Sequence, residues 1–182
     1  MKPALVIVDM QEVLIPLVWQ GAELADRIAA LARDARRHGT PVLALQQIGP
    51  SGSMFDPDAP GTRLSARLGL EPTDVVVRKT ATDAFYSTDL AVLLTEREVD
   101  TLVLTGVATD YCVDATARAA VSHGLDVVLV SDGHAGAAGG DPVAGLSAEQ
   151  VVDRHNRILS TAIHPGGTVR LCPAAEVVFG TG

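Results

Sequence analysis

Three residues that could do chemistry together stand where short apolar runs of the sequence end. They are an acid, an amine and a thiol from distant parts of the chain: Asp9, Lys79 and Cys112. If the apolar runs are parallel strands of one open sheet, their carboxyl ends lie at the edge where such sheets bind ligands. A thiol beside a carboxylate base and an ammonium ion has the groups that nucleophilic catalysis requires. The sequence therefore predicts a cysteine-nucleophile site at the edge of an α/β sheet.

Cys112 follows two residues, Thr109 and Asp110, that are good N-caps for a helix. The cysteine would then lie in a first helical turn, where the helix dipole lowers the pKa of a thiol. The N–H groups of the same turn could hold an oxyanion. The alternative is that Cys112 is a small buried core residue, as most free cysteines are.

Lys79 and Asp9 have structural alternatives as well. Lys79 is one of two lysines in a chain with twelve arginines, and an ammonium ion is a compact charge that fits beside a thiolate and a carboxylate. It could equally be a strand-end lysine whose stem covers apolar surface. Asp9 could take the thiol proton as a base, or it could simply cap a loop.

Candidate substrate-binding residues gather in the segments that follow the apolar runs. Five of the six aromatic residues lie there, together with two glutamines that stand at or just after strand ends. The candidates are Gln11, Trp19, Gln47, Phe55, Phe85, Tyr86 and Tyr111. Aromatic side chains at the loop edge of a sheet favour a pocket for a small flat molecule. The same residues could instead be packing that closes the sheet.

The elements that must position these residues alternate between apolar runs and helical patterns. The runs are Ala4–Asp9, Pro41–Gln46, Asp74–Arg78, Thr101–Thr105 and Asp126–Val130, and Thr168–Leu171 supplies a sixth short strand. The expected helices are Ala22–His38, Thr88–Val99 and Thr109–Ser122. Continuous apolar strands are typical of a parallel sheet buried on both faces. We therefore expect a three-layer, Rossmann-like, doubly wound α/β fold with a six-stranded parallel sheet and helices on both faces.

Two segments rich in glycine, Ile48–Thr62 and Ser131–Pro142, interrupt this alternation. Long loops in compact domains are either lids and binding loops or solvated connections. The sequence leaves both interpretations of these segments open and does not give the conformation of either.

Composition and charge limit the function classes. The chain has 182 residues, which predicts one domain over residues 1–182. Its formal net charge of −8 argues against a nucleic-acid or anionic-membrane surface. The apolar runs are too short to span a membrane, and a strand-like run begins at once, so we expect no signal peptide. Two widely separated cysteines make no disulfide framework, and we expect a cytoplasmic protein with reduced thiols.

Three stretches of the sequence together resemble the isochorismatase-like cysteine hydrolases. They are Val8-Asp9-Met10-Gln11, the segment from Arg78-Lys79-Thr80 to Thr88-Asp89-Leu90, and Thr105-Gly106-Val107-Ala108-Thr109-Asp110-Tyr111-Cys112-Val113. The resemblance implies an Asp9–Lys79–Cys112 triad that hydrolyses a small amide, ureide or lactam through a thioester, as in the streptothricin-hydrolase-like and carbamoyl-hydrolase members. It also implies a cis peptide bond between Val107 and Ala108, which would direct the N–H groups of Ala108 and Cys112 at the oxyanion. Homo-oligomers, dimers or tetramers, are a further implication.

The resemblance runs from residue 4 to about residue 132, and a looser match follows around Val151-Val152 and His155-Asn156. Nicotinamidases of this family carry an Asp-x-His metal motif after the second strand, where this chain reads Gln46-Gln47-Ile48. Amide side chains are poor ligands for a transition metal, so we expect no metal, no cofactor and no nicotinamidase activity.

A metal site elsewhere is also not expected. Asp132, His134 and Asp141 match no metal-ligand spacing, and a solvated loop is the expectation for them.

Two other functions remain open at this point. An isochorismatase-type enzyme would cleave a vinyl ether with Asp9 as the acid and without need of Cys112. A binding module on the same fold would hold a small molecule without turnover. Nucleotide binding is disfavoured, because no G-x-G-x-x-G follows the first strand, where the sequence reads Asp9-Met10-Gln11-Glu12.

Overall fold

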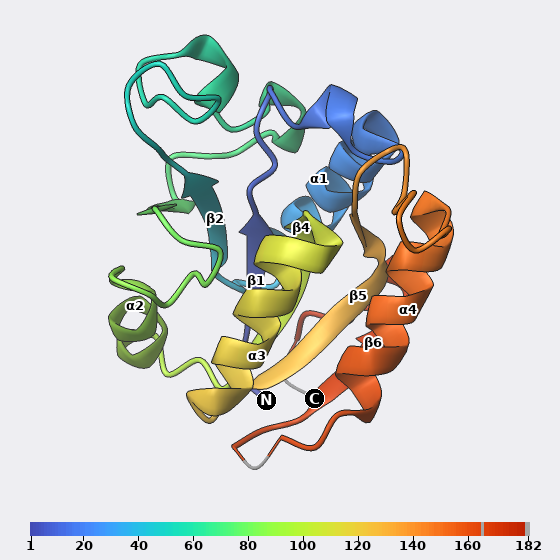
Figure 1. The fold of residues 1–182 in the computed structure, drawn as a ribbon. Coiled ribbons are helices and arrows are strands. Elements are labelled where there is room, and N and C mark those ends of the chain that lie inside the picture. Colours follow the sequence, from blue (N-terminus) through green and yellow to red (C-terminus); the bar gives the residue numbers. More distant parts are fainter. Residues whose placement is uncertain (165, 181–182) are drawn as a thin grey trace.

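A computed structural model describes residues 1–164 and 166–180, and a sheet of six parallel strands lies at its centre (Figure 1). The strands are β1 (Pro3–Val8), β2 (Val42–Gln47), β3 (Val75–Lys79), β4 (Thr101–Val107), β5 (Asp126–Ala135) and β6 (Val169–Cys172). Their order across the sheet is β3-β2-β1-β4-β5-β6. The strand order therefore reverses between β1 and β4, and such a switch point is where open α/β sheets bind their ligands.

Helices cover both faces of the sheet. One face carries α1 (Gly21–Arg37), and the other carries α2 (Leu90–Glu96), α3 (Asp114–Ser122) and α4 (Ala148–Thr161) (Figure 1). Along β1, Leu5 and Ile7 pack against α1, while Val6 and Val8 pack in the core under α2 and α3. Every residue of β1 is buried, which explains why this strand reads as a continuous apolar run. The expected three-layer α/β fold is confirmed.

The end of β5 differs from the sequence-based expectation. β5 continues to Ala135 instead of ending at Val130, because the end of β4 pairs with it beyond a register shift. The first part of Ser131–Pro142 is therefore strand, and the expectation of a loop there is wrong. His134 accordingly lies buried in β5 and not in a solvated loop.

The sequence patterns considered above do not predict α4 as a helix, although a signal for it exists. Ser147 accepts a hydrogen bond from the N–H of Gln150, and the Gln150 side chain accepts one from the N–H of Ser147. This reciprocal pair is a capping box, which marks the start of a helix in sequence as well as in structure.

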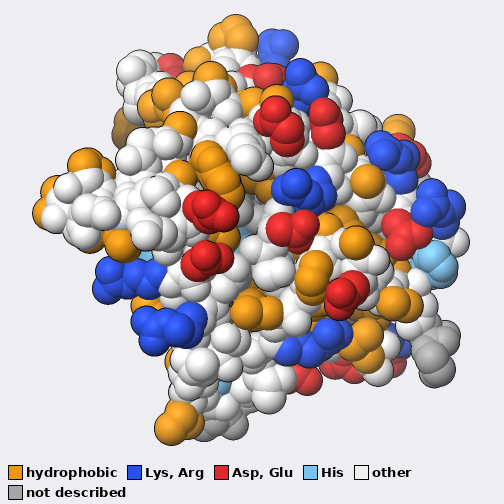
Figure 2. Space-filling view, turned by 90° about the vertical axis from the view of Figure 1, so that its right-hand side faces the viewer, with side chains coloured by type: hydrophobic (Ala, Val, Ile, Leu, Met, Phe, Trp, Pro, Cys, Tyr) orange, Lys and Arg blue, Asp and Glu red, His pale blue; other side chains and the backbone are white. Residues whose placement is uncertain are grey.

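The surface on the side of α4 and β6 carries both signs of charge. Lys and Arg side chains are interspersed with Asp and Glu there, and hydrophobic side chains are scattered between them (Figure 2). Within the part of the chain that the structure describes, no helix is both long and apolar enough to cross a bilayer.

Candidate active site

The structure brings Asp9, Lys79 and Cys112 into contact at the carboxyl edge of the sheet. The Nζ atom of Lys79 lies 2.7 Å from Oδ2 of Asp9 and 3.2 Å from Sγ of Cys112. Asp9 directly follows β1 and Lys79 ends β3, whereas Cys112 lies in the turn after β4. Three sequence segments thus supply one cluster, as the strand-end pattern predicts.

The ammonium group of Lys79 is saturated by its neighbours. Besides Asp9 and Cys112, it donates to Oε1 of Gln47 at 2.7 Å and to the carbonyl oxygen of Ala81 at 3.1 Å. The Lys79 side chain is 0% exposed and that of Asp9 is 2% exposed. An ion pair so deeply buried is stable only when further hydrogen bonds satisfy both partners, and Lys79 meets this condition.

The two carboxylate oxygens of Asp9 have different surroundings. Its Oδ2 pairs with Lys79, whereas Oδ1 is buried and has no hydrogen-bond partner among the described residues. Burial raises the pKa of Asp9, and the charge of Lys79 opposes that rise. A carboxylate oxygen of raised basicity and without a partner is suited to accept a proton.

The thiol of Cys112 is held in its neutral form. Burial, together with the charge of Asp9, raises the pKa of Cys112 to about 12, although Lys79 works in the opposite direction. The expectation of a lowered thiol pKa at a helix N-terminus is therefore wrong. Two physical reasons are the desolvation of the thiolate and the nearby negative charge, both of which disfavour ionisation.

The turn that carries Cys112 also differs from the expected first turn of an α-helix. Thr109–Val113 forms a π-helical turn whose N-cap is Ala108, and no side chain caps it. Neither Thr109 nor Asp110 therefore plays the predicted capping role. The carbonyl oxygen of Ala108 instead accepts hydrogen bonds from the N–H groups of Tyr111 and Val113.

The strand that leads into this turn approaches β1 very closely. Gly106 has φ +116°, and a Cβ atom there would lie 2.1 Å from the carbonyl oxygen of Val8. Only glycine fits this position, because any side chain would collide with the backbone just before Asp9. The peptide bond between Val107 and Ala108, just after Gly106, is cis. The close approach at Gly106 places the segment that leads to Cys112 against the end of β1, just before Asp9.

A cavity of about 350 Å³ opens over the cluster. Its wall contains Asp9 and Cys112 and, of the predicted substrate-binding residues, Gln47, Phe55 and Tyr111. The other lining side chains, which include Leu14, Thr80 and Thr82, are not among the predicted substrate-binding residues. The two threonines follow Lys79 almost directly, so their place after a strand was a usable signal.

Gln11 and Phe85 lie near the cluster but do not line this cavity. Gln11 is fully buried, where its side chain donates to the carbonyl oxygens of Gln47 and Thr62 and accepts from the N–H of Gln47. It therefore holds the end of β2 in place. Phe85 is buried and stacks on His123 with ring centroids 4.5 Å apart.

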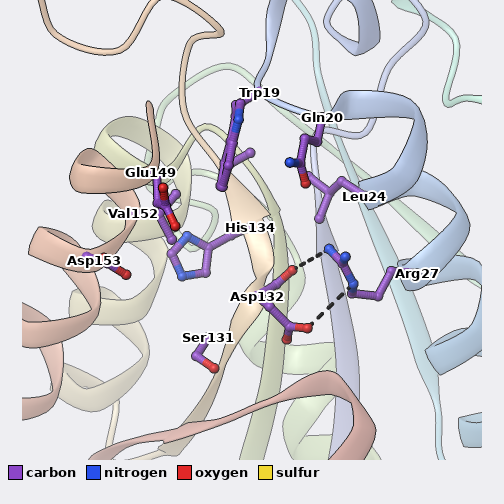
Figure 3. A pocket seen from close by; sticks show the side chains of 11 residues that line it. Trp19, Gln20, Leu24, Arg27, Ser131, Asp132, His134, Glu149, Val152 and Asp153 are labelled. Carbon is purple, nitrogen blue, oxygen red and sulfur yellow. Dashed lines mark hydrogen bonds and ion pairs between the residues drawn. The ribbon is translucent and has the colours of Figure 1, made fainter. Parts of the chain in front are cut away.

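Tyr86 and Trp19 lie elsewhere. Tyr86 is 63% exposed and is not part of the cavity wall. Trp19 lines a separate cavity of about 200 Å³ between the beginnings of α1 and α4 (Figure 3). In that cavity Arg27 pairs with Asp132, and the His134 ring forms part of the wall (Figure 3).

His134 connects three parts of the fold through buried hydrogen bonds. The amide nitrogen of Asn156, on α4, donates to the carbonyl oxygen of Ser131, so its Oδ1 accepts from Nε2–H of His134 at 3.0 Å. Nδ1 of His134 then accepts from the hydroxyl of Thr109 at 2.8 Å. Thr109 begins the turn that carries Cys112. The network therefore fixes that turn to β5 and α4.

Because His134 is buried and neutral, we expect stability to fall in acid. Burial lowers the pKa of His134 to about 4, below the value of about 6.5 for an unperturbed histidine. Between these values the unfolded chain binds a proton that the folded protein does not, so the free energy of unfolding falls as pH drops from about 6.5 toward 4. The full loss from this residue is about 3 kcal/mol.

Urea unfolding from pH 7 to 4 measures this loss. His134→Gln cannot take up a proton, so its stability should change less over that range than the wild type's, whereas His38→Gln, at an exposed position, should follow the wild type. Parallel losses in wild type and His134→Gln would contradict the assignment.

Among the described residues, no group of three or more His, Cys, Asp or Glu side chains is arranged to hold a metal ion.

The structure thus combines a doubly wound α/β fold with an acid, an amine and a thiol in contact at the switch point of the sheet. The isochorismatase domain model matches residues 3–162, and the chain belongs to this family. Streptothricin hydrolase from Streptomyces noursei is 40% identical over 136 residues, which cover 72% of this chain and 54% of that protein. The chain thus spans about half the length of the streptothricin hydrolases that it matches.

Two further proteins extend the comparison. Maleamate amidohydrolase from Pseudomonas putida is 30% identical, and the match covers 72% of this chain and 71% of that protein. The crystal structure of a cysteine hydrolase from Pseudomonas syringae pv. phaseolicola superposes with a TM-score of 0.85 at 26% identity, covering 96% of this chain and 90% of that one.

Proposed function

We propose that this chain is a cysteine hydrolase that cleaves the carbon–nitrogen bond of a small amide, ureide or lactam through a thioester on Cys112. The observation that carries the proposal is the buried, unpartnered Oδ1 of Asp9 in a cluster where Lys79 contacts both the carboxylate and the thiol. The similarity to proteins named streptothricin hydrolase and maleamate amidohydrolase supports it.

The first half of the reaction forms the thioester. Oδ1 of Asp9 takes the thiol proton of Cys112 as Sγ attacks the carbonyl carbon, and the π electrons of the carbonyl move to its oxygen. In the proposed mechanism, the N–H groups of Ala108 and Cys112 stabilise that oxyanion. The carbon–nitrogen bond then breaks, and the leaving nitrogen takes the proton from Asp9.

The second half regenerates the enzyme. A water molecule attacks the thioester carbon while Asp9 accepts a proton from it, and the carbon–sulfur bond breaks. Cys112 recovers its proton from Asp9, and the carboxylic acid leaves. Throughout, Lys79 stays charged and stabilises whichever of the two partners, Asp9 or Cys112, is negative.

The high proton affinities of both groups suit this mechanism. A resting thiolate is not required, because the proton moves only when the substrate carbonyl is in place. Burial raises the pKa of Asp9 as well as that of Cys112, so the Asp9 carboxylate is a stronger base than an exposed aspartate.

Ammonia release from a panel of primary amides, together with mass spectrometry of the enzyme, tests the proposal. We expect turnover of at least one amide and, in the presence of hydroxylamine, formation of the corresponding hydroxamate from an acyl group carried on Cys112. Turnover without any acyl adduct on the Cys112 peptide would contradict the thioester.

One observation favours a second candidate function, vinyl-ether hydrolysis. A carboxyl group whose pKa is raised by burial, as in Asp9, can donate a proton as well as accept one. In that reaction Asp9 would protonate the vinyl group and Cys112 would not be needed. A non-catalytic binding module would instead show ligand binding without turnover of either substrate class.

We also propose that the protein is a cytoplasmic homo-oligomer, a dimer or tetramer. Exposed hydrophobic side chains such as Val143, Ile163 and Val178 are available for contacts between copies. Phe179, by contrast, is buried in its own domain. Analytical ultracentrifugation measures the oligomeric state.

A further inference from the structure

The wall of the cavity over Cys112 is built almost entirely of carbon. Leu14, Phe55 and Val107 contribute apolar surface, and the Tyr111 ring adds an aromatic face at an exposed position. A substrate group that enters this cavity exchanges water for hydrocarbon and aromatic surface. Such an exchange favours apolar groups and disfavours charged ones.

The only charged side chain in that wall, as far as the described residues extend, is Asp9, which is an anion. Because that charge is already paired with Lys79, an anion brought in with the substrate would meet, among the described residues of the wall, no cation to replace the water that it loses.

Lys79 cannot serve as the counter-ion of such an anion. An ammonium group has three protons, and the Nζ atom of Lys79 already contacts Asp9, Gln47, the Ala81 carbonyl and Cys112. Its side chain is 0% exposed. Lys79 therefore interacts only with groups of the cluster and has no N–H left for a substrate anion.

Arg78, next to Lys79 in the sequence, points to the opposite face of β3 and cannot pair with an anion in the cavity. Side chains alternate between the two faces along a strand, and in β3 Lys79 is buried whereas Arg78 is exposed. Arg78 is not part of the cavity wall. The chain therefore places a guanidinium group beside the site in sequence but not in space.

We propose that the cavity selects substrates whose acyl group is uncharged and apolar, and that it rejects acyl groups bearing a carboxylate. This inference rests on the proposed function and names its substrate class. It separates the chain from the activity for which its relative maleamate amidohydrolase is named, since maleamate carries an ionised carboxylate in addition to its amide group. Leu14, Phe55 and Tyr111 set the preference through their apolar surface, which offers a carboxylate nothing in exchange for its water.

Alkylation of Cys112 by iodoacetamide and by iodoacetate tests the proposal without any substrate. The two reagents react with a thiolate in the same way and differ in one charge. The ratio of their rates is measured at one pH for the Cys112 peptide in the folded protein and, as the reference, in the unfolded chain. The fraction of thiolate cancels in each ratio.

We expect the iodoacetamide-to-iodoacetate ratio to be at least about tenfold higher in the folded protein than in the unfolded chain, because a carboxylate loses water at the apolar wall and gains no partner there. Equal ratios would overturn the proposal. Because this result does not depend on amide turnover, it can stand even if the proposed hydrolysis fails, and the two failures are distinguishable.

A comparison of two matched substrates, in the wild type and in two matched variants, provides a second test of the proposal. Crotonamide and fumaramate differ in a methyl group against a carboxylate, and we expect kcat/KM to favour crotonamide by at least about 100-fold. Thr82→Arg places a cation in the wall at an exposed position and should reduce that preference about tenfold. Thr82→Gln, of similar length but uncharged, should leave it unchanged. Comparable hydrolysis of the two amides by the wild type would also overturn the proposal.

Discussion

Cys112→Ala is expected to lower amide hydrolysis by about 10⁴-fold or more, because a nucleophile and its base act as one unit and the remaining groups cannot replace the attacking sulfur. The fold should survive the change. Lys79 keeps its contacts with Asp9, Gln47 and Ala81 when the sulfur is removed, and the Cys112 side chain is only partly buried. Steady-state ammonia release and a thermal unfolding curve measure the two effects separately.

The paired variant Asp9→Ala decides between the proposed functions. Loss of amide hydrolysis in both variants is the expected result. If vinyl-ether hydrolysis is instead mostly retained in Cys112→Ala and lost in Asp9→Ala, the protein is a vinyl-ether hydrolase of the isochorismatase type. Ligand binding by the wild type without turnover of either substrate class would instead indicate a binding module.

The position of Asp9, Lys79 and Cys112 at one edge of the sheet could be predicted because it depends mainly on topology. In a parallel sheet, every strand ends at the same edge, so residues that follow β1, β3 and β4 must share that edge whatever the loops do. This rule places Asp9, Lys79 and Cys112 at that edge. The same argument does not extend to side chains in the loops, whose direction no periodic pattern gives.

The aromatic candidates illustrate that difference. Phe55 and Tyr111 face the cavity over Cys112, whereas Phe85 turns into the core to stack on His123 and Trp19 lies in another cavity. All four follow strands in the sequence. Which of them reaches a common space depends on the path of the loops, and that path is set by tertiary contacts which the local sequence does not contain.

The protonation state of Cys112 could not be predicted for a related reason. A cysteine after a β-strand and before a helix suggests a thiolate stabilised by the helix dipole, an effect worth about 0.3–1 kcal/mol at an exposed site. Burial and the Asp9 carboxylate act in the opposite direction and prevail. The sizes of these two effects depend on how deeply the thiol is buried and how close the carboxylate lies. Residue types alone give neither quantity.

The roles of Asp9 and Lys79 at the thiol are opposite, and this has a consequence for reactivity. The charge of Asp9 raises the pKa of Cys112, whereas the charge of Lys79 lowers it. Asp9 therefore suppresses the thiolate in the resting enzyme, yet the proposed reaction cannot begin unless Asp9 accepts the proton. Alkylation, which needs only a thiolate, and hydrolysis, which needs a base, should respond to Asp9 in opposite directions.

Asp9→Asn is therefore expected to speed alkylation of Cys112 and to abolish hydrolysis. Removal of the carboxylate charge lowers the pKa of the thiol, and the thiolate then becomes the partner that neutralises the buried Lys79. We expect iodoacetamide to react about tenfold faster at pH 8, as a fall of about one unit in the thiol pKa would give. Amide hydrolysis should fall at least about 10³-fold, because asparagine cannot accept the proton.

Lys79→Met supplies the opposite arm of this experiment. Without the ammonium group the pKa of Cys112 should rise further, so alkylation should slow while hydrolysis also falls. Loss of one partner from a buried ion pair should in addition destabilise the fold by about 3–5 kcal/mol, which chemical unfolding measures. If Asp9→Asn and Lys79→Met both slowed alkylation, Asp9 would be acting to form the thiolate in the resting enzyme, and the mechanism with a neutral resting thiol would be wrong. Opposite changes in alkylation, together with loss of hydrolysis in both variants, would identify Asp9 as a base that acts only during turnover.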